Sequence, residues 1–297
     1  MTTIPLTLSQ EDHDGPFEQY LSTARGDINE HIRLVLKDRA VPREVDAHIM
    51  RGKRLRGGLT LLSHDIMGGN DREAALDLAA AVEVAHSIGL IIDDMLDGDV
   101  ERRGEKAVHV DLGAGMAMLE VMGLMSVPYA LAAAHGRAAV DTLADAHHLM
   151  VRGAMSELST SETSWDRYHT IISQKTGELF ALSAAYGAMT ADAGPAEVEA
   201  AREFGARCGI AYQVMDDVLD MDHLNESRGC SGPMLGRLLR IGSDHDIDAR
   251  IDRLCLRRIN EAREAAEAVL DLAPSADPRL RSCLCGAPAE MARMMLR

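Results

Sequence analysis

Aromatic residues are scarce in this sequence. Phe, Trp and Tyr make up 3% of the 297 residues, although hydrophobic residues as a whole make up 46%. That hydrophobic fraction is ordinary for a globular protein with a sizeable core, so Leu, Ala, Val and the 17 methionines must fill it. Met adapts to irregular apolar space, and a Met-rich core is the simplest explanation of its abundance.

The cysteines do not form a disulfide or zinc framework. Their number is odd, and the spacings match no common pattern; they are Cys208, Cys230, Cys255, Cys283 and Cys285. The simplest interpretation of such cysteines is that they are reduced thiols, as is usual in the cytosol. From this we expect a cytoplasmic location.

Signals for export or membrane insertion are also missing. The first residues, MTTIPLTLSQEDHDG, are polar and acidic, without the basic region and apolar stretch of a signal peptide. The longest apolar run, 121–134, is too short to span a bilayer and contains Pro128. We expect a buried helix there and no transmembrane segment.

Positive charge is in deficit. The formal net charge is −16 and the pI is about 5.1, which argues against broad binding to nucleic acid or to an anionic membrane. A small anionic substrate is still compatible with this charge, because local basic clusters or bound metal can reverse its sign.

Strand signals are nearly absent, and apolar residues recur instead at spacings of three and four. This pattern predicts helices over 17–37, 43–67, 71–97, 113–134, 137–160, 164–190, 195–222, 246–271 and 277–295. The predicted fold is a single all-α domain over 17–297, a bundle of about ten or more helices, after a flexible N-terminal segment over 1–16. The stretch 223–245 mixes Gly, Ser and Pro and is predicted to be a loop.

Two acidic clusters of identical spacing lie inside apolar helical segments. Each reads D-D-x-x-D, and their members are Asp93, Asp94 and Asp97 in the first and Asp216, Asp217 and Asp220 in the second. Carboxylates at this spacing share one helix face. Because they repel one another and are costly to bury unpaired, a compensating cation is expected. Mg²⁺ prefers such oxygen ligands together with substrate phosphate, so the clusters predict a site for several Mg²⁺ ions.

Three basic groups stand out against this acidic background. They are Arg51-Gly52-Lys53-Arg54-Leu55-Arg56-Gly57-Gly58, Arg102-Arg103-Gly104 and Lys175-Thr176-Gly177. The first is not a Walker loop, because no Ser or Thr follows its Gly-Lys. Glycines beside Lys and Arg suit a site where backbone and cations approach phosphate oxygens.

Together these residues resemble the trans-isoprenyl diphosphate synthase family over roughly residues 45–222. The segments that carry the resemblance, in the family's order, are G-K-R-L-R at 52–56, Glu83 and His86 as E-x-x-H, DDMLDGDVERRG at 93–104, Lys175-Thr176, and YQVMDDVLD at 212–220. Any one segment is weak, but the ordered set is specific.

The resemblance implies helices around a deep central cavity, usually in a homodimer, with a heteromer left open. It implies that isopentenyl diphosphate is condensed with an allylic diphosphate. Residues implied to bind Mg²⁺ and the allylic diphosphate are Asp93, Asp94, Asp97, Asp216, Asp217 and Asp220, with Arg102, Lys175, Thr176 and Gln213. Residues implied to bind isopentenyl diphosphate are Lys53, Arg56, His86 and Arg103. Residues expected to carry the catalysis are Asp93, Asp94, Asp97, Lys175 and Asp216.

The sequence departs from the family pattern after the second motif. The G-K-x-x-G-x-D-L-x-x-G-K stretch is not recognisable there, and ungapped counting places Cys230 on its first Lys and Arg240 on its last. Arg240 could still meet phosphate, whereas Cys230 could not replace a cation. A Gly-Gln pair of the family reads Gly153-Ala154 here.

Three further readings stay open beside prenyl elongation. A terpene cyclase would keep the aspartates but need no isopentenyl site, and a non-catalytic subunit of another synthase would fit the altered 223–245 stretch. A phosphohydrolase of the HD type could use His64-Asp65 but would not explain the paired aspartate motifs. For an elongating enzyme, Ile88 and Gly89 just upstream of the first motif leave no aromatic plug, which favours a product of C20 or longer.

Overall fold

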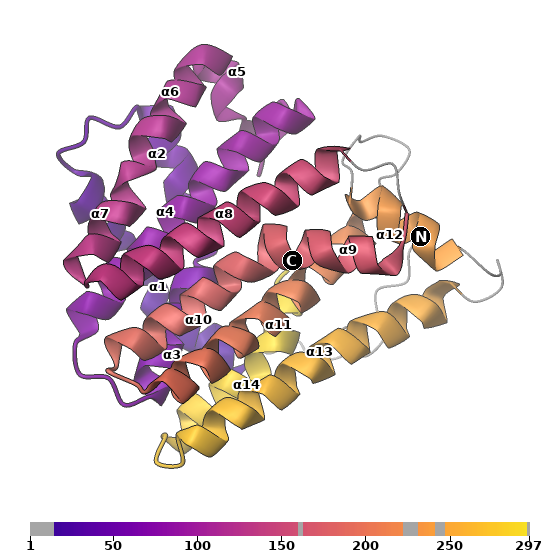
Figure 1. The fold of residues 1–297 in the computed structure, drawn as a ribbon. Helices are drawn as coiled ribbons and strands as arrows, with labels where there is room; N and C mark the ends of the chain where they lie inside the picture. The colour runs from indigo at the N-terminus through magenta and orange to yellow at the C-terminus, as the bar shows by residue number, and fades with distance from the viewer. Residues whose placement is uncertain (1–14, 160–162, 222–230, 241–246, 296–297) are drawn as a thin grey trace.

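The computed structural model describes residues 15–159, 163–221, 231–240 and 247–295 (Figure 1). These residues form fourteen α-helices, one π-helical segment and one short hairpin, which confirms the all-α prediction. Most of the predicted flexible segment lies outside the described residues, and its last residue, Pro16, already begins the first helix.

The N-terminal half supplies the helices that hold the first aspartate motif. Their bounds are α1 Pro16–Leu36, α2 Arg43–Met50, α3 Leu55–Ile66, α4 Arg72–Asp97, α5 Val108–Leu112, α6 Ala114–Leu124 and α7 Ser126–Ala134. Asp71 caps α4, because its side chain accepts a hydrogen bond from Ala74 N at 3.0 Å. Gly98 ends α4 in the left-handed conformation, with φ of 73°. The first motif therefore occupies the last turn of α4.

The C-terminal half supplies the second motif. Its elements are α8 Arg137–Ser159, α9 Trp165–Ile172, η1 Ser173–Gly177, α10 Glu178–Thr190, α11 Pro195–Asp220, α12 Ser231–Arg240, α13 Ile247–Leu272 and α14 Pro278–Arg293. The second motif occupies the last turn of α11. Figure 1 shows α13 and α14 on one side of the molecule and α5–α7 on the opposite side.

Helix α10 lies at the centre of the fold. Every residue from Leu179 to Ala188 is buried, because α3, α4, α8 and α11 pack around it. Two glycines permit the closest approaches. A Cβ at Gly187 would overlap the backbone of α3 at Thr60, and a Cβ at Gly205 would overlap the backbone of α10 at Phe180. The packing of α3, α10 and α11 thus requires residues without a side chain at these two positions.

Three predicted helices are interrupted. The 43–67 helix breaks because Arg54 is left-handed, with φ of 63°, and the 164–190 helix contains the π-helical turn η1. The 113–134 helix divides into α6 and α7. The predicted 223–245 loop is wrong over 231–240, where Met234, Leu235, Leu238 and Leu239 form the buried face of α12. The rest of that stretch lies outside the described residues.

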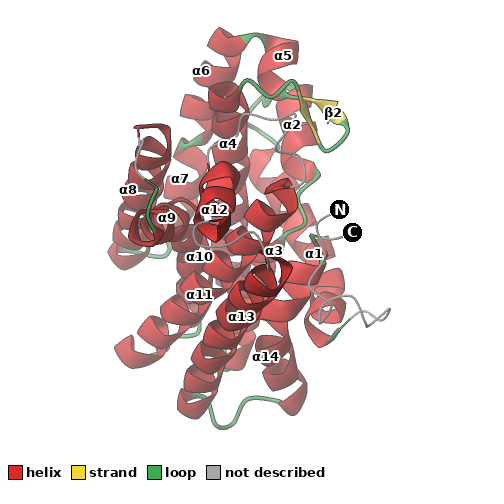
Figure 2. Cartoon of the chain, turned by 90° about the vertical axis from the view of Figure 1, so that its right-hand side faces the viewer, coloured by secondary structure: helices red, strands yellow, loops and turns green. Residues whose placement is uncertain are grey.

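A two-stranded hairpin follows the first motif and was not predicted. Strand β1 (Glu101–Arg102) pairs antiparallel with β2 (Glu105–Lys106). Its turn residues, Arg103 and Gly104, have φ of 54° and 76°, as a two-residue primed turn requires. Figure 2 shows this hairpin beside α2, and Arg103 Nη1 donates to Arg51 O at 3.1 Å. The turn thereby positions Arg103 beside the first basic segment.

The apolar run at 121–134 is not the buried helix that we expected. Two stretches are long and apolar enough to cross a membrane by length and composition alone, Arg72–Asp97 and Ala114–Ala134. The first is 67% buried inside the fold, but the second is only 33% buried. In α6 only Ala117, Val121 and Leu124 are buried, and its large apolar side chains Met116, Met118, Leu119 and Met122 are exposed. The absence of a transmembrane segment stays a prediction.

We predict that Gly205→Ala lowers the unfolding free energy by about 2 kcal/mol or more, because the new methyl overlaps backbone that cannot move aside. The control is Gly26→Ala, which lies within α1 with nothing within 4 Å of a Cβ. This control should gain about 0.5–1 kcal/mol from its lower chain entropy. Urea denaturation measures both. Equal effects would contradict the close approach of α10 and α11.

Candidate functional site

The two aspartate motifs face each other across shared cations. Lys175 and Arg102 both act electrostatically on Asp93 in the first motif and on Asp216 in the second. Burial raises the pKa of Asp93 above its usual value. For Asp216, burial and the neighbouring Asp220 raise the pKa to about 6. The fold thus gathers carboxylates from α4 and α11 into one poorly solvated group, as the sequence predicted.

Lys175 is held in this group by a residue that sequence analysis missed. Its Nζ lies 2.6 Å from Glu157 Oε2 and 3.5 Å from Asp93 Oδ1. Burial opposes the charge of Lys175, but Asp93 and Glu157 outweigh it and raise the pKa of the ammonium. Glu157 lies on α8 one turn after Gly153. A Cβ built at Gly153 would meet Gln174 and the Lys175 backbone. This Gly lets α8 approach η1, and it was the signal that could have pointed to Glu157.

The middle aspartate of each motif is buried against protein partners. Asp94 is 0% exposed and Asp217 is 1% exposed. Arg102 Nε donates to Asp94 Oδ1, and the Tyr168 hydroxyl donates to Asp217 Oδ2 at 2.6 Å. Asp97 and Asp220, by contrast, are exposed at the ends of their helices. The two motifs therefore share an arrangement in which the middle carboxylate is buried against protein partners and the last carboxylate is exposed.

The donor set suits a hard cation that brings ligands of its own. It consists of carboxylate oxygens, and Asp94 Oδ2 is buried without a hydrogen-bond partner. Within the described ranges, no three His, Cys, Asp or Glu side chains are close enough to hold a metal ion by themselves. Mg²⁺ usually takes one or two carboxylates and completes its shell with water and phosphate. The residues present fit Mg²⁺ bound together with a diphosphate.

The cations predicted for isopentenyl diphosphate form a second group beside Asp216. The charge of Asp216 acts on both Lys53 and Arg56, and that of Arg103 opposes both. Burial, followed by Arg56 and Arg103, holds the pKa of His86 well below its usual value, so His86 is neutral. The fold thus brings together all four predicted residues.

Arg56 is the most unusual cation of this group. It is 7% exposed, its guanidinium lies 4.2 Å from the centroid of the Phe180 ring, and its Nε is buried without a hydrogen-bond partner. Burial is the main reason that its pKa lies below the usual value. Among the described contacts, no ion pair joins it to a carboxylate. A cation buried in this way is costly unless an anion joins it.

Arg54, which was assigned no role, shapes the basic segment. Its side chain is fully enclosed and donates to Asn29 Oδ1 at 2.6 Å, Ile49 O at 2.7 Å and Glu83 Oε2 at 3.4 Å. Glu83 also accepts from Gly57 N at 2.8 Å. Glu83, predicted as part of E-x-x-H, is therefore a structural partner of this segment. The Arg54–Glu83 pair ties the basic segment to α4.

The remaining predicted residues divide between the site and the surface. Thr176 and Gln213 are hydrogen-bonded to each other at 2.6 Å, next to the second motif. Arg240 is exposed at the end of α12, and among the contacts described for 231–240 none joins it to the other predicted residues. His64 bonds to Thr190 and Asp65 to Tyr20 and Arg72, which gives both members of the HD pair structural roles.

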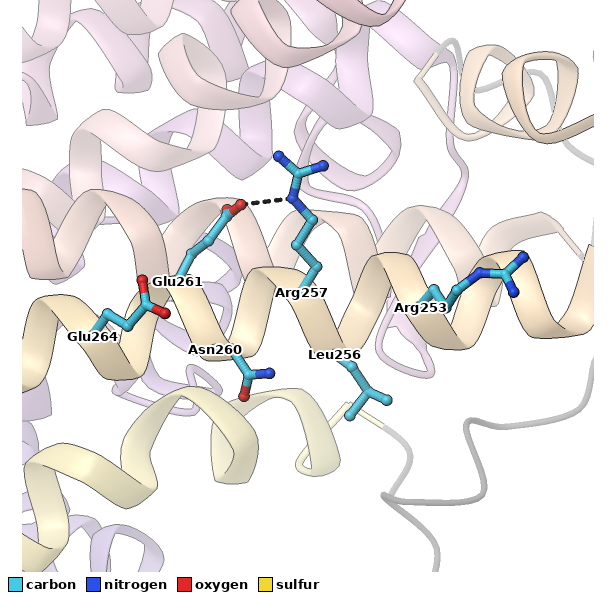
Figure 3. Close-up of a pocket in the computed structure, with 6 residues that line it drawn as sticks. All are labelled: Arg253, Leu256, Arg257, Asn260, Glu261 and Glu264. Carbon is cyan, nitrogen blue, oxygen red and sulfur yellow. Dashed lines mark hydrogen bonds and ion pairs between the residues drawn. The ribbon is translucent and has the colours of Figure 1, made fainter.

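A surface hollow of about 540 Å³ lies along α13, lined by Arg253, Leu256, Arg257, Asn260, Glu261 and Glu264 (Figure 3). Figure 3 shows Arg257 and Glu261 paired with each other on this helix, at 2.9 Å. None of the predicted site residues lines this hollow. The predicted central cavity stays a prediction.

Comparison with known families supports the grouping of these motifs. The family model described as polyprenyl synthetase matches residues 41–231. That range contains both aspartate motifs and every predicted site residue except Arg240. It omits α1, α13 and α14.

Two relatives and one solved structure illustrate the similarity. A short chain isoprenyl diphosphate synthase of Methanothermobacter thermautotrophicus is 34% identical over 60% of this chain and 57% of its own length. A geranylgeranyl diphosphate synthase of Sulfolobus acidocaldarius is 31% identical over 69% of this chain and 66% of its own. The alignments thus span less than two thirds of either relative.

A polyprenyl synthase of Caulobacter crescentus, solved with calcium and isoprenyl diphosphate, has a TM-score of 0.74 and 25% identity. It covers 95% of this chain and 99% of its own. The similarity in fold therefore includes the helices that the family model omits.

Proposed function

This chain belongs to the polyprenyl synthetase family, and from that membership we propose that it is a Mg²⁺-dependent trans-prenyltransferase. It condenses isopentenyl diphosphate with an allylic diphosphate. The names of the relatives support this substrate class. Arg56 carries the proposal: over the part of the chain that the structure describes, no carboxylate forms an ion pair with this enclosed cation, and such a cation calls for an anionic substrate.

The allylic diphosphate is assigned to the gap between the aspartate motifs. Mg²⁺ would be held there by the motif carboxylates, with Asp93, Asp97, Asp216 and Asp220 facing the gap. Bound metal would supply positive charge for the diphosphate that leaves. Lys175 adds a charge that the protein itself holds in place.

The reaction follows from this separation of charges. The allylic C–O bond breaks, and Arg102 and Lys175 stabilise the negative charge that grows on the leaving diphosphate. The π electrons of the isopentenyl double bond form the new C–C bond to the allylic cation. This step leaves a carbocation on the isopentenyl unit. A proton then leaves the carbon next to that cation and is taken up by the released diphosphate. Lys53, Arg56 and Arg103 hold the isopentenyl diphosphate throughout, because their charges need an anion.

A terpene cyclase fits the site less well. It would use the aspartate motifs but give no role to Lys53, Arg56, His86 and Arg103. A non-catalytic subunit would give no role to either group. The intact second cation group therefore favours elongation.

The test is product analysis with purified protein, Mg²⁺, isopentenyl diphosphate and the C5, C10, C15 or C20 allylic diphosphate in separate reactions. We predict an elongated diphosphate. Asp93→Ala should lower kcat by at least about a hundredfold, because a carboxylate facing the gap is lost. Arg56→Gln should raise the KM for isopentenyl diphosphate by about tenfold or more.

Arg137→Gln is the control, because this arginine side chain is 90% exposed on α8. It should change neither constant. Hydrocarbon or alcohol products would support the cyclase instead. No product with any substrate would leave only a partner-dependent or non-catalytic subunit.

We propose a product of C20 or longer. Gly89 lies one turn before Asp93 on α4, and a Cβ built there meets nothing within 4 Å. This open space supports the view that the growing chain passes Gly89. The geranylgeranyl product named for one relative agrees with that length.

Gly89→Phe should shorten the product by one or more five-carbon units, because a ring at this position fills the space that a longer chain needs. Chromatography of the dephosphorylated products measures the length. Gly26→Phe is the matched control, since a Cβ there also meets open space but lies on α1. An unchanged length for Gly89→Phe would reject the assignment.

A second copy of the chain is the partner that we propose for the exposed apolar face of α6 and its neighbour α5. Its large apolar side chains, each 42–67% exposed, are Val110, Met116, Met118, Leu119 and Met122. Helix α8 also exposes Val151, Met155 and Leu158. Glu120 is the one charged residue of α6, so this helix adds little to the repulsion expected between two chains of net charge −16. Exposed apolar patches of this kind mark interaction sites.

We predict a dimer by analytical ultracentrifugation, and a monomer for the double variant Leu119→Glu with Met122→Glu. Two carboxylates placed on the apolar face would have to be desolvated in the dimer. Leu34→Glu is the control, because Leu34 is 61% exposed on α1, outside this face. A wild-type monomer, or a double variant that stays dimeric, would contradict the proposal.

A further inference from the structure

Four side chains form a continuous hydrogen-bonded chain beneath the second aspartate motif. The Tyr168 hydroxyl of α9 donates to Asp217 Oδ2 at 2.6 Å. Gln213 Nε2 donates to Asp217 Oδ1 at 3.0 Å, and the Thr176 hydroxyl donates to Gln213 Oε1 at 2.6 Å. The chain thereby joins α9, α11 and η1. Nothing in the proposed function uses Tyr168.

The chemistry of the groups fixes the direction of every hydrogen bond. Both oxygens of Asp217 accept, Oδ2 from the Tyr168 hydroxyl and Oδ1 from the Gln213 amide nitrogen. The Tyr168 hydroxyl has a single proton, and its 2.6 Å hydrogen bond directs that proton to Asp217 Oδ2. The Gln213 carbonyl must then face Thr176, whose single proton it accepts. Tyr168 and Asp217 therefore determine which way the Gln213 amide points.

The Gln213 amide in turn contacts the part of the motif that faces the gap. Gln213 Nε2 also lies 3.3 Å from Asp216 Oδ2, and Asp216 is one of the carboxylates assigned to Mg²⁺. Reversal of the amide would place a carbonyl oxygen against both Asp216 and Asp217, where it would be repelled. The orientation of Gln213 is thus coupled to the geometry of the metal and diphosphate site.

We propose that Tyr168 is a positioning residue for the allylic half of the reaction, acting through Asp217 and Gln213 on Asp216. This inference rests on the proposed function. It also revises the role of Thr176. The Thr176 hydroxyl donates its proton to Gln213, so only its lone pairs are available to a ligand in the gap. Thr176 then accepts hydrogen bonds there, while Lys175 supplies the donor for phosphate oxygens.

The side chain of Tyr168 allows a clean test. Its ring packs in the apolar cluster around α9, α11 and α12, so Tyr168→Phe removes the hydroxyl and keeps the ring. Tyr186→Phe is the matched control. Tyr186 is also fully buried, and its hydroxyl donates to Ala139 O at 2.7 Å, but it lies in the separate cluster of α4, α7, α8 and α10.

The first measurement is a calorimetric titration with Mg²⁺ and inorganic pyrophosphate together. Tyr168→Phe should weaken this binding by about tenfold or more, as expected when a group that orients a metal ligand is lost. Tyr186→Phe should bind as the wild type does. Equal binding by the wild type and Tyr168→Phe, or equal weakening in both variants, would overturn the proposal.

Kinetics give a second readout that a purely structural role would not produce. Tyr168→Phe should raise the KM for the allylic diphosphate by about tenfold and leave the KM for isopentenyl diphosphate unchanged. A general loss of folding would instead lower kcat without this split. Equal changes in the two KM values would overturn the proposal.

A double-mutant cycle tests the coupling through Gln213. If Tyr168 acts through Gln213, Tyr168→Phe should add little to the loss of pyrophosphate binding already caused by Gln213→Met. Additive losses would overturn the proposed route. Gln213→Met also serves as a second test of the same route if Tyr168→Phe lowers stability, because Gln213 is only partly buried.

The outcomes separate this inference from the proposed function. Pyrophosphate binding requires no turnover, so the variants can be compared even if the wild type elongates no allylic substrate. That result would reject the proposed function and leave the positioning role of Tyr168 to be decided by the titration. A wild type that does not bind Mg²⁺ and pyrophosphate would overturn both.

Discussion

The site depends on charges that the protein gathers but does not neutralise. Two carboxylate clusters at the ends of α4 and α11 surround Lys175 and Arg102, and a separate cation group around Arg56 lies beside them. Each group is unfavourable alone, because burial penalises charge and like charges repel. In the proposed function, metal ions would compensate the first group and a diphosphate the second. The uncompensated charge is therefore the feature that selects the ligands, and the helices serve to hold it in place.

Holding such charges requires a second set of polar contacts, made between protein groups. Arg54 is enclosed between Asn29, Glu83 and the carbonyl of Ile49, and it fixes the segment that carries Arg56. The middle aspartates serve the same purpose in the acidic motifs, where Asp94 holds Arg102. These contacts are made to protein partners, and that pairing makes burial tolerable; Asp94 Oδ2, which is buried without a hydrogen-bond partner, is the exception among them. Function and support thus alternate along the same few residues of sequence.

The sequence predicted the helices and the shared helix face within each motif because both follow from local spacing. D-D-x-x-D places carboxylates on one helix face wherever the helix packs. It did not predict the break at Arg54 or the π-helical turn at Lys175, since each depends on what the chain packs against. The hairpin turn at Arg103 needs two positive φ values that an Arg-Gly pair only weakly signals. The roles of Glu157 and Tyr168 were not predicted, because their partners are 18 and 49 residues away in the sequence.

The ends of the chain complete the site although the family model covers only residues 41–231. Lys53 Nζ donates to the carbonyl of Met294 at 2.5 Å, just after α14, where the end of the helix dipole favours a cation. Glu290 of α14 accepts from the backbone nitrogen of Glu18 at 2.9 Å, which ties α14 to α1. Asn29 of α1 then reaches Arg54. A backbone carbonyl and a buried carboxylate leave no motif in the sequence, so this support of the cation group follows from the fold rather than from the signature.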